Sequence, residues 1–444
     1  MNLQSADAMR KHVEPAREIP ITDDVDVLVI GAGPAGIGAA LAAGRCGAKT
    51  LLVEQFNCVG GMATSGLMSN FSGSPTSPFH RELIEAMEAH PAGQSPDCPP
   101  NNAHAIRHEA LKSVMLRKLD EAKVGLRLYT FACDAIMEGQ RIAGMIYESK
   151  TGRGAIRAQV VIDCTGDGDI AARAGAAYQL GREGDQVCQP VTLMFRIGGV
   201  DYSQAIFPAS FESYMEIPKG EVQALGKANL PFPAGHVLLY RTAIPNEVCV
   251  NMTNVIGIDG TKAEDLTRAE RVCRDQMDAI VLFLREFVPG YTNCFLVAAA
   301  QTVGVRETRH FKGVYTLTAE DIVEARVFDD WIAARNAFNF DIHNTVGHGL
   351  DANGAQLEFR SKGEYTIPYR ACLPETIDGL LLAGRNISGT HKAHSNYRVM
   401  SICLNMGHGV GTAAALAVQD RVLPRDVDVS KVQARLRAAG VTLK

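Results

Sequence analysis

Residues 28–38 read LVIGAGPAGIG, an apolar run that leads into three closely spaced glycines. The run Val25–Ile30 is rich in β-branched residues, which is typical of a buried strand. Pro34 opens a segment of small residues, PAGIGAALAAGRCG, that predicts a helix ending near Gly47. A second apolar run at residues 50–54 predicts the next strand. The pattern therefore predicts a β–α–β unit of about thirty residues, the context in which glycines at this spacing bind a dinucleotide.

Each glycine of this unit has its own expected role. Gly31 permits the tight turn, Gly33 lets the backbone approach a pyrophosphate, and Gly36 allows the helix to pack closely on the strand. The phosphates would lie on the free N–H groups at the helix N-terminus. Glu54 ends the second strand, where its carboxylate could accept hydrogen bonds from a ribose and would repel a 2′-phosphate, which argues against NADP. The alternative is a tight turn without a ligand.

Composition narrows the function further. The 444 residues carry 44 Lys and Arg against 49 Asp and Glu, a net charge of −5 without a basic block, so nucleic acid is not an expected partner. No apolar run reaches about 18 residues, so no membrane span is expected. The first twenty residues lack the apolar core of a secretory signal. The 11 cysteines form no CxxC pair, which favours reduced thiols and a cytoplasmic protein.

Three later stretches favour FAD over NAD. GGMATSG (60–66) could let an extended ligand pass close to the chain. VVIDCTGDGD (160–169) and DGLLLAGRN (378–386) each read as an apolar strand that ends in a glycine turn, and the ends of parallel strands form the ligand crevice. Residues 126–163 alternate apolar and polar positions, which predicts an inserted β-meander. The N-terminal half of the helix expected at 401–418 is glycine-rich, and its bare backbone amides could stabilise charge on a reduced flavin.

These stretches, with GVRETRHFKGVYTLTAEDI at 304–322, resemble the family of FAD-dependent oxidoreductases, within the glutathione-reductase-like flavoproteins. The resemblance covers most of residues 25–420 and is weakest between about 180 and 300. It implies a tightly bound FAD. It implies that the pyrophosphate and adenosine lie against Gly31, Gly33, Ala35, Gly36, Glu54, the backbone around Cys133, Thr165, Gly166 and Asp167. It implies that the ribityl chain and flavin lie against Gly60, Gly61, Ala63, Thr64, Gly384, Arg385, Arg398, Met400, Gly409 and Gly411.

The sequence also departs from the disulfide reductases of that superfamily. Cys58 stands without a second nearby cysteine, so dithiol chemistry is not expected. A second strand–GxGxxG–helix unit is missing from the sequence, so a stably bound NAD(P)H domain is not expected either. Electrons would then come from the substrate, from a transient NAD(P)H, or from another protein.

The expected fold is α/β. A Rossmann-like FAD-binding domain with a parallel sheet and a β-meander carries an inserted α+β substrate domain, and active sites form where such domains meet. Helices are expected at 107–125 and 263–290, with a capping box that begins at Thr318. The predicted parts are an N-terminal tail (1–22), a discontinuous FAD domain (23–177 and 376–422), a substrate domain (178–375) and a C-terminal segment (423–444).

Four residues are candidates for positioning or protonating the substrate, while flavin N5 exchanges the hydride. Arg306 and Arg309 could bind a carboxylate or carbonyl, or form structural salt bridges with Glu307 or Glu324; the two interpretations stand equal. His391 and His394, in a loop expected near the flavin, could act as acid or base, or simply bond to backbone. A covalent His– or Cys–flavin link is a minor alternative. No metal site is expected, because the spacing of Asp341 and His343 is unspecific.

The leading functional interpretation is a flavoenzyme that transfers a hydride to or from a small organic substrate, by dehydrogenation or ene reduction. Two alternatives stay open: a hydratase or isomerase that needs reduced FAD without net redox change, and an electron-transfer subunit of a larger complex. Residues 178–375 contain no motif that identifies the substrate. The direction of electron flow and the oligomeric state are also open at this stage.

Overall fold

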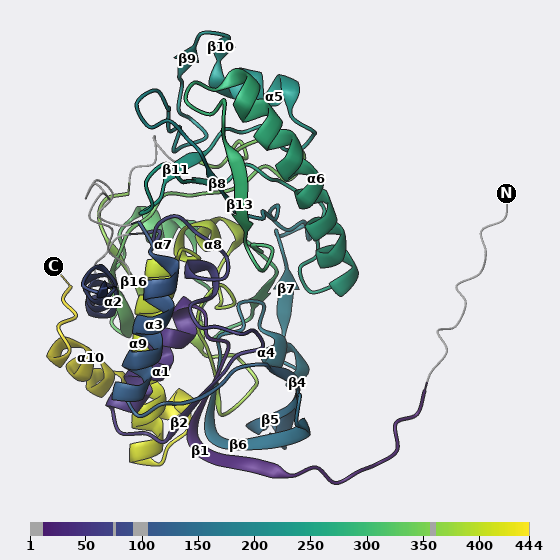
Figure 1. Cartoon of the computed structure of the whole chain (residues 1–444). Coiled ribbons are helices and arrows are strands. Elements are labelled where there is room, and N and C mark those ends of the chain that lie inside the picture. Colours follow the sequence, from purple (N-terminus) through teal and green to yellow (C-terminus); the bar gives the residue numbers. More distant parts are fainter. Residues whose placement is uncertain (1–11, 74–76, 92–104, 356–360, 444) are drawn as a thin grey trace.

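Two packed units make up the protein, and each has its own hydrophobic core (Figure 1). The computed structural model describes residues 12–73, 77–91, 105–355 and 361–443. Of the predicted N-terminal tail, residues 1–11 lie outside that range, and residues 12–20 have no regular secondary structure. The first strand begins at Ile21, close to the predicted end of the tail.

A seven-stranded sheet forms the larger unit. Its strand order is β3-β2-β1-β6-β5-β4, and β17 pairs with the end of β6. The strands β3, β2, β1, β6 and β17 are parallel, whereas β4, β5 and the start of β6 form an antiparallel meander. The predicted parallel sheet with its β-meander is thus confirmed. The strands are β1 (Ile21–Ile30), β2 (Thr50–Val53), β3 (Gly125–Arg127), β4 (Thr130–Glu138), β5 (Arg141–Ser149), β6 (Gly152–Asp163) and β17 (Leu380–Leu382).

Helices cover this sheet and set the position of its ligand-facing edge (Figure 1). The expected helices after the first strand, near residue 107 and near residue 401 all form. The helices of the larger unit are α1 (Pro34–Arg45), α2 (Pro78–Glu88), α3 (His108–Glu121), α4 (Asp169–Arg173), α7 (Ala319–Val323), α8 (His391–Tyr397), α9 (Met400–Asp420) and α10 (Val429–Ala438). Helix α7 begins with the predicted capping box between Thr318 and Asp321.

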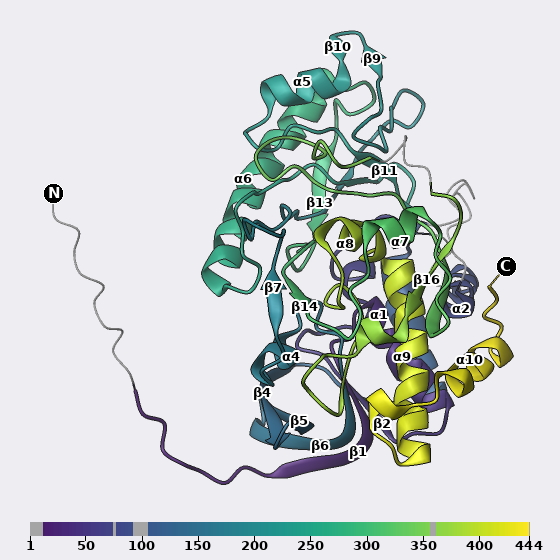
Figure 2. The ribbon, with the colours of Figure 1, turned by 180° about the vertical axis from the view of Figure 1, so that it is seen from behind.

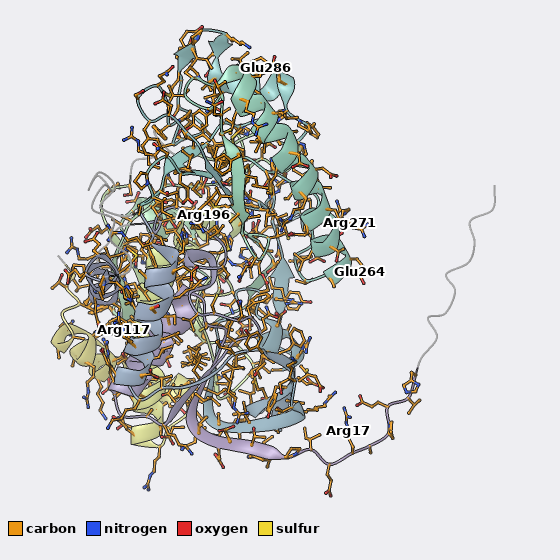
Figure 3. The ribbon with its side chains drawn as sticks, in the orientation of Figure 1. Arg17, Arg117, Arg196, Glu264, Arg271 and Glu286 are labelled. Carbon is orange, nitrogen blue, oxygen red and sulfur yellow. The ribbon has the colours of Figure 1, made fainter. Side chains whose placement is uncertain are left out.

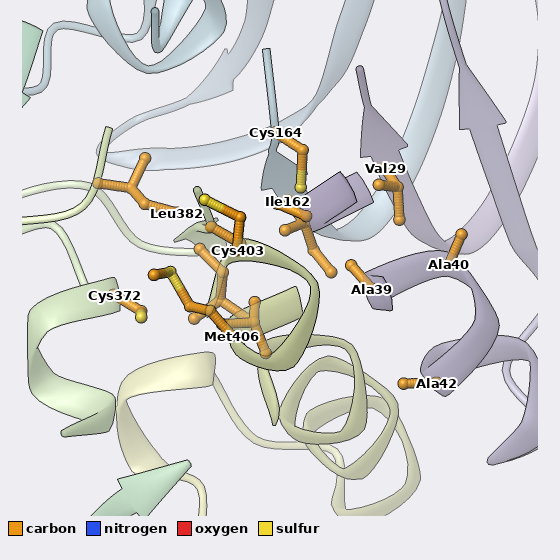
Figure 4. Packing of buried hydrophobic residues seen from close by; sticks show 14 of the residues in the cluster. Val29, Ala39, Ala40, Ala42, Ile162, Cys164, Cys372, Leu382, Cys403 and Met406 are labelled. Atoms are coloured by element: carbon orange, nitrogen blue, oxygen red, sulfur yellow. The ribbon is translucent and has the colours of Figure 1, made fainter. Parts of the chain in front are cut away.

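Glycines let α9 pack unusually close to α1. A Cβ atom on Gly407 would lie 2.0 Å from the carbonyl oxygen of Ala35, and one on Gly411 would lie 2.1 Å from that of Ala39. The small side chains of α1 complete the contact beside Ile162 of the sheet (Figure 4). Helix α9 is long and apolar enough to cross a membrane by length and composition, but 94% of that stretch is buried inside the protein. Its apolar composition is accounted for by this core packing.

The smaller unit is an antiparallel sheet backed by two helices (Figure 1). Its strand order is β11-β12-β8-β13, and the long helix α6 buries one face against it through residues such as Cys273, Met277 and Leu284. A short β9–β10 hairpin lies at its outer end. The elements are β8 (Phe195–Gly198), β9 (Glu216–Ile217), β10 (Gly220–Glu221), α5 (Val222–Asn229), β11 (Leu239–Arg241), β12 (Val248–Val250), α6 (Ala263–Phe287) and β13 (Phe295–Ala299).

The boundary between the units differs from the predicted one. The smaller core is built from residues 191–300 together with Leu67, whereas residues from Phe311 to Leu373 pack into the larger core. Two strand pairs explain why the chain rejoins the larger unit before the predicted residue 376. They are β7 (Tyr178–Leu180) with β14 (Arg309–Phe311), and β15 (Trp331–Asn336) with β16 (Tyr365–Pro368). Seen from behind, β7 and β14 lie between the two units (Figure 2). The inserted unit is therefore shorter than the predicted 178–375.

Candidate functional site

A cavity of about 820 Å³ opens where the carboxyl ends of β1, β2, β6 and β17 meet the smaller unit. Parallel strands place their ends at one edge, so segments far apart in the sequence converge there. One wall comes from the glycine turn after β1, and the opposite wall comes from α6 and residues 301–305. A cavity of this size falls within the range of small-molecule and cofactor sites.

The glycine turn forms its wall from backbone. Gly31 has φ +95°, and a Cβ on it would lie 2.5 Å from the carbonyl oxygen of Cys164. A Cβ on Gly36 would lie 1.8 Å from the carbonyl oxygen of Gly31, so only glycine lets α1 start this close to β1. Gly33 has no other protein atom within 4 Å of its Cβ position, because it faces the cavity.

The N-terminus of α1 is left free to bind an anion. Gly33 is its N-cap, Pro34 follows, and no side chain caps the helix. The first turn contains no acidic residue. The unpaired N–H groups and the helix dipole therefore favour a negatively charged ligand such as a phosphate at this end.

Glu54 follows β2 and braces the glycine turn. Its Oε2 accepts a hydrogen bond from the Ala32 N–H at 2.8 Å, and its Oε1 accepts one from the Phe56 N–H at 2.9 Å. Burial raises the pKa of Glu54, and these hydrogen bonds partly offset that effect. The carboxylate also lines the cavity. It therefore stands where the predicted ribose contact requires it, and that contact stays a prediction.

Asp163, at the end of β6, holds the next turn in place. Its Oδ1 accepts hydrogen bonds from the Thr165 N–H at 3.0 Å and the Thr165 hydroxyl at 2.7 Å, and its Oδ2 accepts one from the Ala171 N–H at 2.8 Å. Complete burial raises the pKa of Asp163 to about 6 in spite of these donors. The turn it supports brings three predicted cofactor residues to the cavity lining, namely Thr165, Gly166 and Asp167.

Two arginines line the cavity from the other side, and both are anchored by carboxylates. Arg385 donates to Asp167 Oδ1 at 3.0 Å. Arg398 donates from Nη2 to the backbone oxygen and to Oδ2 of Asp341, each at 2.9 Å, and Asp341 also pairs with His343 at 3.3 Å. Burial would raise the pKa of Asp341, but His343 and Arg398 outweigh it and hold the pKa well below the usual value. A fixed positive charge thus borders the cavity.

Most of the predicted cofactor residues lie in this lining, and a few lie just behind it. Gly60, Ala63 and Thr64 are outside the lining. The Gly60 N–H donates to the Ala32 carbonyl at 2.7 Å and the Thr64 hydroxyl to the Val59 carbonyl at 2.6 Å, so this segment supports the lining residue Gly61. Cys133 is also outside the lining, although the preceding residues of β4 belong to it. The predicted residues in the lining are Gly31, Gly33, Ala35, Glu54, Gly61, Thr165, Gly166, Asp167, Gly384, Arg385, Arg398 and Met400.

The expected role of Gly409 and Gly411 around the flavin needs correction. Helix α9 begins at Met400, so these glycines lie more than two turns inside the helix and away from its free N–H groups. A Cβ on Gly409 would lie 2.2 Å from the Ile332 carbonyl oxygen, and Gly411 faces α1. They permit close packing of the helix. The residues of α9 that line the cavity are Met400 and Cys403.

Arg306 and Arg309 are both engaged outside the lining of the large cavity. Arg309 donates to the Asp167 carbonyl and to Asp169 Oδ1, each at 2.9 Å. Arg306 donates to the Pro190 carbonyl at 2.7 Å and the Thr192 hydroxyl at 2.8 Å, and burial lowers its pKa to about 9. These contacts are of the kind that a structural role predicts, and binding of a substrate group by either arginine stays a prediction. The partners in these contacts differ from the expected ones, Glu307 and Glu324.

His391 and His394 lie in helix α8 rather than in the expected loop. Thr390 is the N-cap, and its hydroxyl accepts a hydrogen bond from the Ala393 N–H. His391 Nδ1 lies 2.6 Å from Glu307 Oε1, so a side chain, not backbone, is its partner. Neither histidine is among the cavity-lining residues. A direct acid–base role in the large cavity is therefore not supported by the geometry.

Sequence reasoning missed most of the wall opposite the glycine turn. No motif marks these residues, because their side chains converge only through the packing of the two units. Ser65 and Met62 could have been predicted, since they lie inside the GGMATSG stretch at 60–66. The missed lining residues include Met62, Ser65, Leu266, Thr267, Glu270, Arg271, Gln301, Thr302, Val303 and Val305.

The fold and the cavity together define a dinucleotide-binding α/β protein with a ligand site at the sheet edge. The model of the FAD dependent oxidoreductase family matches residues 26–436, and the chain belongs to that family. The glycine turn, the uncapped α1 terminus and the size of the cavity fit FAD, which is the cofactor that the family indicates.

Several known proteins are similar to parts of this chain. Digeranylgeranylglycerophospholipid reductase 2 of Methanopyrus kandleri is 26% identical over 223 residues, which are 47% of this chain and 54% of the relative. Thiamine thiazole synthase of Aeropyrum pernix is 27% identical over 159 residues, 33% of this chain and 57% of the relative. The chain thus spans about half the length of the curated relatives it matches.

One solved structure shows the same fold over nearly the whole chain. It is a geranylgeranyl bacteriochlorophyll reductase-like protein from Thermoplasma acidophilum, with a TM-score of 0.50 and 13% identity. The match covers 94% of this chain and 84% of the solved chain. At this identity the similarity shows the fold alone.

Proposed function

We propose that this protein is an FAD-dependent oxidoreductase that exchanges a hydride between flavin N5 and a small organic substrate. The observation that carries the proposal is the cavity of about 820 Å³ at the edge of the parallel sheet. It runs from the glycine turn, where a dinucleotide pyrophosphate fits, to a second wall built by α6 and residues 301–305. The cavity lies between the two hydrophobic cores, where a substrate can be enclosed against the cofactor.

The residues beyond the glycine turn suit a substrate with a polar group. Ser65, Gln301 and Thr302 supply hydrogen-bonding groups to the lining, and Arg398 supplies a positive charge held by Asp341. Met62 and Val305 supply apolar surface. We expect Arg398 to orient an electron-rich substrate group or to stabilise negative charge that develops during the reaction, because its guanidinium is already fixed in position.

Reduction of a carbon–carbon double bond is the favoured direction over dehydrogenation. The support comes from the relatives, since two proteins of Methanopyrus kandleri at 26% and 27% identity are named reductases. The electrons for a reduction would come from a transient NAD(P)H or from a protein partner, because the sequence has a single dinucleotide-binding motif.

The decisive experiment is an absorbance spectrum of the purified protein, followed by an anaerobic substrate screen. We expect flavin absorbance from FAD and changes in that absorbance in proportion to turnover when a substrate is added. A preparation that stays colourless after incubation with FAD would contradict the proposal.

The same screen separates the two alternatives. A hydratase or isomerase would turn over substrate with no net change in flavin absorbance. An electron-transfer subunit would co-purify with a stoichiometric redox partner and would turn over no small substrate alone. Either result would replace hydride exchange as the function of the site.

A further inference from the structure

A buried cluster of histidines around one carboxylate lies outside the lining of the large cavity. Its members are Glu307, His310 and His394, and each is buried, with exposed fractions of 1%, 6% and 1%. Glu307 and His310 belong to the segment that leads into β14, and His394 belongs to α8. The proposed flavin chemistry assigns no role to this cluster.

Three donors converge on Glu307. His310 Nε2 lies 2.8 Å and His391 Nδ1 lies 2.6 Å from the same oxygen, Oε1, while the Gln189 N–H donates to Oε2 at 2.9 Å. The imidazole of His394 packs edge-on against that of His310, with ring centroids 4.6 Å apart. One carboxylate oxygen therefore carries two imidazoles, and a third imidazole stands beside them.

Two ring nitrogens in this cluster have no hydrogen-bond partner among the residues that the structure describes. They are Nδ1 of His310 and Nδ1 of His394, and both atoms are shielded from solvent. An unpartnered polar atom inside a protein is costly and calls for an explanation. An ion bound beside Glu307 is such an explanation for His394, whereas His310 turns its Nε2 toward that carboxylate. Glu307, His310 and His394 also each present one ligand atom, and these three atoms lie within 4.8 Å of one another.

We propose that Glu307, His310 and His394 form a binding site for a divalent transition-metal ion of the zinc type. Two imidazole nitrogens and one carboxylate oxygen are ligands that such ions prefer, whereas Mg²⁺ and Ca²⁺ prefer oxygen alone. A tetrahedral ion with bonds of about 2.0–2.1 Å needs its ligand atoms roughly 3.3 Å apart, so modest side-chain movement suffices.

The residues around the three ligands support this site. His391 and the Gln189 N–H hold the carboxylate of Glu307, as outer residues commonly do for a ligand carboxylate. The neighbouring Thr308 donates to Asp167, which lines the large cavity. An ion would therefore tie α8 to the segment before β14 and stabilise the wall that carries Asp167. Its role is structural, and it does not depend on the redox function proposed above.

Metal binding by the chelator-treated holoenzyme tests the site directly. The protein is dialysed against low-micromolar Zn²⁺ and its zinc content is measured by mass spectrometry. We expect about one ion per chain, together with a rise in the unfolding temperature when Zn²⁺ is added. The variants His394→Ala and Glu307→Gln should bind roughly tenfold more weakly or worse, and should lose that rise in temperature.

A matched control separates this site from general histidine binding. His408 is also buried, has an unpartnered Nδ1, and stacks on Phe79 with ring centroids 3.9 Å apart. His408→Ala should keep the zinc stoichiometry. The proposal is overturned if the wild-type protein binds no more Zn²⁺ than His394→Ala does, or if His408→Ala loses the ion equally. The wild-type measurement alone decides the case if His394→Ala fails to fold.

Discussion

The two walls of the large cavity are built in different ways. The wall formed by the glycine turn is almost entirely backbone: a Cβ on Gly31 or Gly36 would overlap a carbonyl oxygen. The opposite wall consists of side chains from α6 and from residues 301–305, including Thr267 and Arg271. Figure 3 labels Arg271 on α6. The first wall presents backbone N–H groups, which every residue type except proline possesses, so it can hold the same phosphates regardless of substrate.

This difference has a consequence for how each wall responds to mutation. A backbone wall depends on the absence of side chains, so any substitution at its tight positions disturbs the fold. A side-chain wall can change its chemistry with little effect on stability, since an exposed residue on a helix contributes little to the core. Cofactor binding and substrate choice should therefore be separable by mutation in this protein.

The largest effect is expected for Gly36→Ala. The new methyl group would lie 1.8 Å from the Gly31 carbonyl oxygen, so α1 must move away from β1. We expect a loss of about 3 kcal/mol or more in the free energy of unfolding, because the obstacle is backbone. Thermal unfolding of the FAD-free protein measures the change.

Gly33→Ala is the matched partner of that variant. Gly33 has a negative φ of −68° and open space at its Cβ position, so the FAD-free protein should keep its stability. FAD content should fall, because the methyl group occupies the cavity. If both variants lower the stability of the FAD-free protein equally, the overlap with backbone at Gly36 is not what determines the loss of stability.

A second test uses the pH dependence of stability contributed by Asp163, which supports the backbone wall. Its pKa is about 6 in the folded protein against a reference value of 3.8. Between these values the folded state keeps a proton that the unfolded state releases, so this group lowers stability as pH rises from about 4 to 6. Above that range the cost is constant, about 3 kcal/mol for a shift of roughly two units.

Asp163→Asn removes this titration. We expect the stability difference between wild type and variant to shrink as pH rises from 4 to 7, because only the wild type incurs the growing cost. Urea unfolding at a series of pH values measures both proteins. Parallel curves for the two proteins would show that the Asp163 carboxyl titrates alike in both states.

A third, smaller effect is expected at Arg398, a lining residue whose side chain is held in place by Asp341. Arg398→Met removes the donor to Asp341 Oδ2 and leaves the carboxylate with His343. The loss of a partner for a largely buried acceptor costs roughly 1–3 kcal/mol. Arg398→Lys keeps the charge without the forked geometry and should recover part of the stability. Chemical denaturation and the rate of flavin reduction should both follow this order; equal values for Met and Lys would exclude the charge as the cause.

The same contrast explains which features could be predicted from the sequence. The turn at Gly31, Gly33 and Gly36 has fixed spacing because one helix must pack on one strand, so a local pattern records it. The turn after Asp163 could also be predicted, because a local pattern of an apolar strand followed by glycines marks it. The contacts of Arg306 and Arg309 could not be predicted in this way, because their partners, Thr192 and Asp169, lie more than a hundred residues away in the chain.

Two misplaced features had different causes. The glycines of α9 were assigned to the flavin because glycine suits both a ligand contact and a close helix crossing, and only the packing of Gly411 against α1 distinguishes the two. Helix α8 was interpreted as a loop, although Thr390 before His391 offered a capping signal. A helix of seven residues is too short to show a clear helical repeat, and the preceding Gly389 favoured a loop.

The smallest effect on stability is expected in the side-chain wall, for Arg271→Ala. Arg271 is exposed on α6 and lines the cavity, so its removal should change the free energy of unfolding by no more than about 0.5 kcal/mol and leave FAD content unchanged. If this wall faces the substrate, KM should change while the FAD content stays constant. Lys at the same position keeps the charge and should stay close to wild type for an anionic substrate. A fall in FAD content without a change in KM would instead assign this part of α6 to the cofactor, and the division of labour between the two walls would no longer hold.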